Sequence, residues 1–206
     1  PPLFLAETAS TLNEYLLADH LMRQTQDPAD QRYFLSDLLQ RFLNGLFRQS
    51  QISEFEVWAH TEGKQRQLGA DELQAKWFEL ARERGGSAID VLDIEAAGWS
   101  RVPHLFIYPF YCFNYTLSNL IVLALIHQYH SDAEDFVTRY RAFLRLGGGA
   151  SPSELLHWLH IDLDSPSFYA DAFQELEAML ERLEALTPAI DSTPLQKNVQ
   201  AERGNA

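Results

Sequence analysis

Apolar side chains recur at intervals of three or four along most of this chain, which is the spacing of amphipathic helices. Stripes of this kind run over residues 5–22, from Pro28 towards His60, and over 70–84. Alternation of apolar and polar residues is nowhere long enough for a sheet of any size. The pattern therefore predicts an all-α fold, and its later helices are expected over the following ranges: 132–146, 151–160, and from Pro166 through Leu183.

Glycines and capping residues set the expected boundaries of these helices. Gly45 interrupts the second stripe, and the Gly85-Gly86 pair ends the third. A capping box of Ser131 and Glu134 is expected to open helix 132–146. Three consecutive glycines at 147–149 predict a sharp break before the next helix.

Three segments lack a helical period. Residues 61–68 are polar and predict a loop, and residues 187–206 predict a frayed polar tail beyond a helical unit of residues 1–186. Residues 87–107 are expected to form an extended, partly buried connection. Its carboxylates are expected to be solvated: Asp90, Asp93 and Glu95.

The stretch from His104 to Ile126 is expected to lie at the centre of the fold. Residues 117–126 are apolar on every face, which is typical of a helix covered on all sides. Residues 104–115 carry one His, three Tyr and three Phe. Aromatic rings with polar tips suit one wall of a ligand cleft. The alternative is that these rings are ordinary core with satisfied hydroxyls.

Charge and cysteine content narrow the range of partners. The 206 residues carry 16 Lys+Arg against 29 Asp+Glu, a formal charge of −13. Such a charge repels phosphate backbones and anionic membrane surfaces, so we expect neither nucleic acid nor membrane as a partner. The single cysteine, Cys112, excludes an intrachain disulfide and suits a reducing, cytoplasmic location. It is interpreted as a buried, inert thiol.

Three groups of residues could carry chemistry. Glu7 and Glu14 lie two turns apart on the first helix; an inward Glu requires a metal or a cation, whereas a Glu near a helix start is also favoured by the helix dipole. The pairs His127/His130 and His157/His160 have metal-ligand spacing but no evident third ligand. The glycine run has neither the preceding strand nor the lysine of common phosphate loops, so a helix break is the preferred interpretation.

Four segments together resemble a known family. They are FLAETASTLNEYLL, FRQSQISEFEVWAH, HLFIYPFYCFNYTLSNLIVLAL and LRLGGGASPSELLHWLHIDLDSPSFY, in that order. In sequence and order they are similar to the C-terminal part of the zinc oligopeptidases of the thimet oligopeptidase and oligoendopeptidase F family. The resemblance implies the multi-helix C-terminal portion of a zincin-like catalytic domain.

The resemblance also implies roles for individual residues. Glu7 matches the third zinc ligand of the family, and His104 matches a histidine that contacts substrate near the oxyanion. Tyr108 and Tyr111 match tyrosines that bind substrate and stabilise the tetrahedral intermediate, with Tyr115 as a further substrate contact. Phe113 stands where the family often has a tyrosine. Two glycines, Gly147 and Gly148, correspond to a flexible loop at the cleft.

The HExxH motif of the family is absent. None of the seven histidines is followed by Glu, so the two imidazoles and the general base that this motif supplies are not in the chain. We therefore expect part of a zinc peptidase of short peptides, inactive by itself, with an incomplete site for one zinc ion. An apolar surface left by the missing part is expected to promote self-association. The alternative is a non-enzymatic helical module that binds a peptide or a partner helix.

Overall fold

The computed structural model describes residues 2–187, and within this range every regular element is helical. The predicted all-α class is confirmed. Apart from Thr187, the predicted tail 187–206 lies outside the described residues. The elements, in chain order, are α1 (Leu3–Gln24), α2 (Pro28–Leu43), the π-helical η1 (Asn44–Arg48), α3 (Gln49–Gly63), α4 (Ala70–Gly85), the 3₁₀ helix η2 (Asp93–Arg101), α5 (His104–Ile107), α6 (Phe113–Ser131), α7 (Ala133–Leu146), α8 (Pro152–Trp158) and α9 (Pro166–Leu186).

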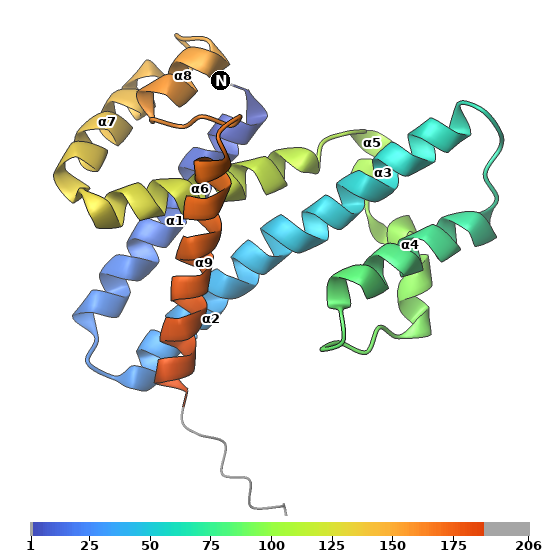
Figure 1. Cartoon of the computed structure of the whole chain (residues 1–206), viewed down its shortest axis with the longest axis horizontal. Helices are drawn as coiled ribbons and strands as arrows, with labels where there is room; N and C mark the ends of the chain where they lie inside the picture. Colours follow the sequence, from blue (N-terminus) through green and yellow to red (C-terminus); the bar gives the residue numbers. More distant parts are fainter. Residues whose placement is uncertain (1, 188–206) are drawn as a thin grey trace, which may run out of the picture.

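Helix α6 is the centre of the molecule, as the apolar run predicts. It packs against α1, α9, α7, α3 and η1, and it crosses the middle of the molecule in Figure 1. Residues 121–126 are buried without interruption and join the main core. The fully buried middle of α6 therefore fixes the helix within the main core.

Helices α2 and α3 form one long rod that links two parts of the fold (Figure 1). The main core lies at one end, and a smaller core at the other joins α3, α4 and the residue before α6. The buried members of this smaller core are Ile52, Phe55, Trp77, Leu80 and Cys112. The rod therefore connects the main core to the segment that carries α5.

The interruption predicted at Gly45 is a π-helical turn and does not end the helix. A Cβ at Gly45 would overlap the side chain of Asn119 on α6. The missing side chain therefore lets η1 and α6 approach closely, and the chain continues as α3 to Gly63. The prediction of a loop over 61–68 was wrong for its first three residues.

Three other predictions from the sequence were wrong. Residues 87–107 are not an extended connection, because they contain η2 and α5; η2 is held by short-range bonds such as that from the Glu95 N–H to the Leu92 carbonyl. Glu95 is not simply solvated, since it accepts hydrogen bonds from Arg48 and Trp77. The N-cap of α7 is Asp132, which accepts from the Asp135 N–H, and not the box that begins at Ser131.

None of the helices within residues 2–187 combines the length and hydropathy that a membrane crossing requires.

Candidate active site

Glu7 and Tyr111 meet across the fold although 104 positions separate them. Glu7 is half-buried on the second turn of α1, and Tyr111 lies in the loop between α5 and α6. The Tyr111 hydroxyl donates a hydrogen bond to Glu7 Oε1 at 3.5 Å. The packing of α1 against α6 brings them together. A carboxylate from the start of the chain and a phenol from its middle thus share one site.

Three further predicted residues surround this pair. The rings of His104 and Tyr111 stack with centroids 5.2 Å apart, and Tyr115 meets the edge of Tyr111 at 5.4 Å. Tyr108 lies 6.3 Å from Tyr111 and is 63% exposed. Five of the residues predicted from the sequence therefore form one group, here called the Glu7–tyrosine cluster: Glu7, His104, Tyr108, Tyr111 and Tyr115.

The Glu7–tyrosine cluster brings phenol hydroxyls, which can donate hydrogen bonds, close to the carboxylate of Glu7. Burial, the adjacent Tyr111 hydroxyl and the Glu7 charge together raise the pKa of Tyr115 to about 12. The Tyr115 phenol therefore keeps its proton throughout the neutral range. Phenol O–H groups and a histidine ring can donate to a substrate carbonyl, and one carboxylate can serve as a metal ligand.

The loop that carries Tyr108 and Tyr111 has an unusual backbone. Phe110 adopts φ 58°, in the left-handed region that non-glycine residues rarely occupy. Its N–H donates to Oε1 of Glu56 on α3 at 2.7 Å, and its ring lies 4.8 Å from that of His60. No role was predicted from the sequence for Glu56 or His60. The one indication that they could be functional was that both lie in one of the four segments that resemble the family.

Cys112 follows in the same loop and is 1% exposed. Burial, with the nearby Glu56 charge, raises the pKa of its thiol to about 11. The predicted burial of this thiol is confirmed. Its raised pKa favours an inert thiol at neutral pH, and that inertness stays a prediction.

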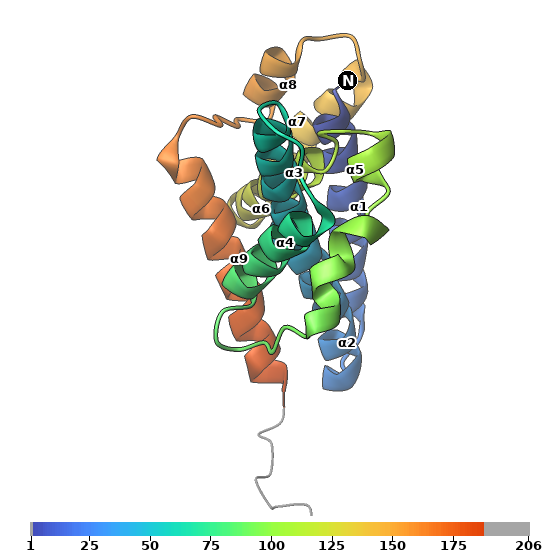
Figure 2. The same cartoon turned by 90° about the vertical axis from the view of Figure 1, so that its right-hand side faces the viewer.

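Gly147 and Gly148 lie outside this cluster, between α7 and α8. Gly147 has φ 52° and ends α7, so the predicted helix break is confirmed. In both views α8 lies next to the N-terminal end of α1, the helix that carries Glu7 (Figures 1 and 2). A role of these glycines in substrate contact stays a prediction.

The histidine pair of α6 has a structural partner. His130 Nδ1 lies 3.1 Å from Glu175 Oε1 on α9, and His127 Nδ1 lies 3.9 Å from the other oxygen. His130 Nε2 is 3.1 Å from the Tyr15 hydroxyl on α1. The hydrogen bond to Glu175 raises the pKa of His130. These contacts join α1, α6 and α9.

The described residues do not complete a metal site. Within residues 2–187, no group of three or more His, Cys, Asp or Glu side chains is arranged to hold a metal ion. In the Glu7–tyrosine cluster, Glu7 is the only carboxylate, and His104 stacks on Tyr111. By themselves these residues do not fit a zinc ion.

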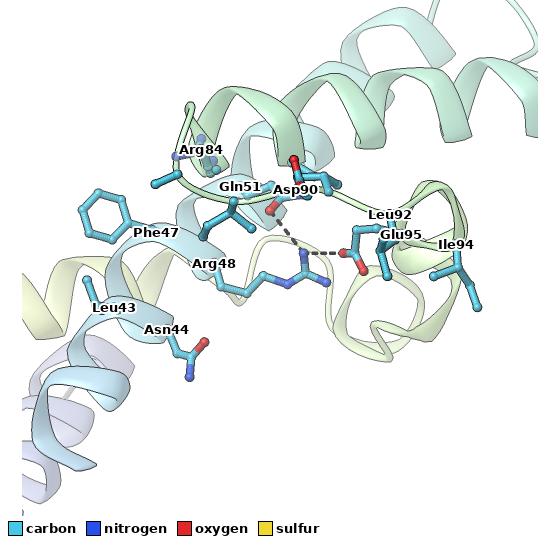
Figure 3. A pocket seen from close by; sticks show the side chains of 15 residues that line it. Leu43, Asn44, Phe47, Arg48, Gln51, Arg84, Asp90, Leu92, Ile94 and Glu95 are labelled. Atoms are coloured by element: carbon cyan, nitrogen blue, oxygen red, sulfur yellow. Dashed lines mark hydrogen bonds and ion pairs between the residues drawn. The ribbon is translucent and has the colours of Figure 1, made fainter. Parts of the chain in front are cut away.

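A cavity of about 690 Å³ lies elsewhere. It opens between the α2–α3 rod and the segment after α4, and Arg48 inside it donates to both Gln51 and Glu95 (Figure 3). No member of the Glu7–tyrosine cluster lines it. A choice by cavity volume would therefore select a different part of the fold from the Glu7–tyrosine cluster.

Comparison with known proteins places the chain in a family. The model of peptidase family M3 matches residues 1–175. The chain belongs to peptidase family M3. It is 32% identical over 186 residues to oligopeptidase PepF of Bacillus subtilis, covering 89% of this M3 chain and 28% of that relative. It is also 31% identical over 187 residues to a plasmid-encoded oligoendopeptidase F of Lactococcus lactis subsp. cremoris.

Solved structures show the same similarity in three dimensions. The crystal structure of oligoendopeptidase-F from Enterococcus faecium superposes with a TM-score of 0.77 at 30% identity, over 89% of the M3 chain and 36% of the matched one. A putative peptidase from Chlamydophila abortus gives 0.80 at 28% identity, over 90% and 31%. The M3 chain thus spans about three-tenths of the length of these relatives. The predicted family resemblance is confirmed.

Proposed function

We propose that the complete protein is a zinc-dependent oligopeptidase that hydrolyses short peptides, and that this chain supplies part of its active site. The observation that carries the proposal is the contact of the Tyr111 hydroxyl with Glu7, together with the stacking of His104 on the Tyr111 ring. Glu7 would serve as one zinc ligand, and two imidazoles would come from polypeptide beyond this chain. Bound zinc would supply a water of lowered pKa and polarise the scissile carbonyl.

The residues of this chain then bind and orient the substrate. His104 and Tyr111 would donate hydrogen bonds to the oxygen that gains negative charge during attack. One such donor typically contributes about 2.7–4 kcal/mol to transition-state stabilisation. Tyr115 keeps its proton and would donate to a substrate carbonyl, while the exposed Tyr108 would contact the peptide backbone. Gly147 and Gly148 would line the substrate channel.

The surface of α1 supports the view that further polypeptide covers this site. Leu3 and Leu21 lie on the same stripe of α1 as Glu7, and both are exposed. Leu17, on the adjoining face, is 60% exposed. Apolar side chains on the stripe that carries a metal ligand are expected where another helix packs. This favours an incomplete catalytic unit over a self-sufficient binding module, and self-association through this surface is part of the proposal.

Metal content and activity of the 206-residue chain test the proposal directly. We expect negligible zinc by elemental analysis, and no cleavage of a quenched fluorescent peptide, from a sample whose intact mass matches the chain. Near-stoichiometric zinc would show that a complete site lies within the chain and would overturn the assignment.

The role of Glu7 is tested in the complete protein. Glu7→Ala should remove both zinc and peptidase activity. Glu14→Ala is the matched control, because Glu14 lies two turns along the same helix, is exposed and pairs with Arg41 among the described residues. Normal zinc content and activity in Glu7→Ala would show that the ligand role is wrong.

A further inference from the structure

Three consecutive residues carry the Tyr111 side chain to Glu7, and the two outer ones are fixed by α3. Phe110 donates its N–H to Glu56 across 54 positions of sequence, at 2.7 Å. Cys112 is buried in the smaller core against residues of α3 and α4. Tyr111 lies between them and reaches away to Glu7. The direction of its side chain therefore depends on both attachments to α3.

The Phe110 backbone needs such an attachment. A left-handed φ of 58° costs conformational free energy in a residue with a Cβ, so the surrounding structure must hold it. The Phe110 side chain is 45% exposed, and its burial contributes only part of that stabilisation. Its ring does lie against His60, one turn beyond Glu56 on α3. One turn of α3 thus holds both the backbone and the ring of Phe110.

Glu56 is itself unusual for a carboxylate. It is 2% exposed in the middle of α3, where an ionised side chain is costly unless it accepts hydrogen bonds. Its hydrogen bond to the Phe110 N–H is short, as bonds to charged acceptors are. Cys112 carries no side-chain hydrogen bond that would cap α6, and a local contact at that end is the Asn114 side chain, which donates to the Tyr111 carbonyl at 2.8 Å.

We propose that Glu56 is the positioning residue of the Glu7–tyrosine cluster. Its carboxylate holds Phe110 in the left-handed conformation and thereby aims the Tyr111 hydroxyl at Glu7. Glu56 acts through the loop and does not touch the substrate. This inference rests on the proposed function, in which Tyr111 donates to the reacting carbonyl.

Three substitutions of Glu56 in the complete protein test separately its acceptor oxygen, the length of its side chain and its charge. Glu56→Gln keeps an acceptor oxygen at the same reach and should retain most activity. Glu56→Met keeps the length of the side chain but has no acceptor oxygen. Its kcat should fall at least about tenfold with KM little changed, which is part of the 10²–10³-fold in kcat that one oxyanion donor contributes. Glu56→Asp keeps the charge but withdraws it by one methylene, so it should also lose kcat. The control is Glu54→Met, a half-exposed carboxylate of α3 that pairs with Arg84.

A double-mutant cycle with Tyr111→Phe tests the route of the effect. If Glu56 acts through Tyr111, the variant that carries both Glu56→Met and Tyr111→Phe should be no slower than Tyr111→Phe alone. If the losses in kcat of the two single variants multiply in the double variant, the two residues act independently and the positioning role of Glu56 is wrong. So would wild-type kcat in both Glu56→Met and Glu56→Asp while Tyr111→Phe is slow. Wild-type activity of Tyr111→Phe would instead contradict the proposed role of Tyr111 itself.

Amide hydrogen exchange on the 206-residue chain tests whether Glu56 holds the loop, and it does not require catalytic activity. The Phe110 amide should be protected in the wild type and in Glu56→Gln. In Glu56→Met it should exchange rapidly, while the amides in the middle of α6 stay protected and report that the fold persists. Undiminished protection of the Phe110 amide in Glu56→Met would show that Glu56 does not hold the loop. Should Glu56→Met not fold, Glu56→Asp provides the same comparison.

Discussion

Replacing Gly45 by alanine should destabilise this protein, although alanine is normally the better helix former. In a helix interior, Ala is favoured over Gly by about 0.5–1 kcal/mol. At Gly45, however, the new Cβ would overlap the side chain of Asn119, which is almost fully buried on α6. Overpacking of this kind typically costs about 1–3 kcal/mol.

A lost hydrogen bond adds to this cost. Asn119 Nδ2 donates to the Tyr115 carbonyl at 2.7 Å, and a side chain displaced by the new Cβ would break that bond. A buried polar group left unsatisfied costs about 1–3 kcal/mol. After subtraction of the gain in helix propensity, we expect a net loss of about 1–5.5 kcal/mol in the free energy of unfolding. Each kcal/mol should lower Tm by about 2–4 °C for a chain of this size.

Urea denaturation of the 206-residue chain, followed by circular dichroism, measures this loss. The matched control is Gly63→Ala, at the end of α3, where a Cβ would meet nothing within 4 Å. That variant should be neutral or slightly more stable. If Gly45→Ala were as stable as Gly63→Ala, the close approach of η1 to α6 would not be a constraint, and the explanation of the π-helical turn would fail.

Three further predictions concern the core, a thiol and pH. Leu123→Ala, at a fully buried position of α6, should lower the free energy of unfolding in urea by about 2–5 kcal/mol. The control Leu17→Ala, at an exposed position, should lower it by about 0.5 kcal/mol or less. Similar losses in the two variants would contradict the central role of α6. Cys112 should react with iodoacetamide at pH 8 far more slowly in the folded chain than in urea, since burial raises its pKa to about 11, and equal rates would refute that burial. The hydrogen bond to Glu175 raises the pKa of His130 above its unfolded value near 6.5, with the charges of Asp19 and Arg23 nearby. The stability that the protonated imidazole contributes is therefore complete below about pH 6.5, and it is lost as pH rises through the folded pKa. His130→Gln should accordingly destabilise the chain more at pH 6 than at pH 9, and an equal loss at both would show that the protonated imidazole contributes nothing.

The sequence by itself determined the parts of this protein that depend on neighbours along the chain. The helical stripes follow from a spacing of three to four residues, and caps such as Ser151 and Asp27 act within three positions. The apolar run of α6 required burial on all sides, so its central place was predictable. The resemblance to a peptidase family added the residues of the Glu7–tyrosine cluster, which no spacing rule would have collected.

Only the tertiary structure decided how distant residues meet. The contact of Tyr111 with Glu7 depends on how α1 packs against α6, and that of Phe110 with Glu56 on where α3 passes the loop. The π-helical turn at Gly45 arises from its contact with Asn119, and η2 carries no periodic stripe because the bonds that hold it join residues three apart. Such features depend on packing between segments tens of residues apart, which a local pattern does not encode.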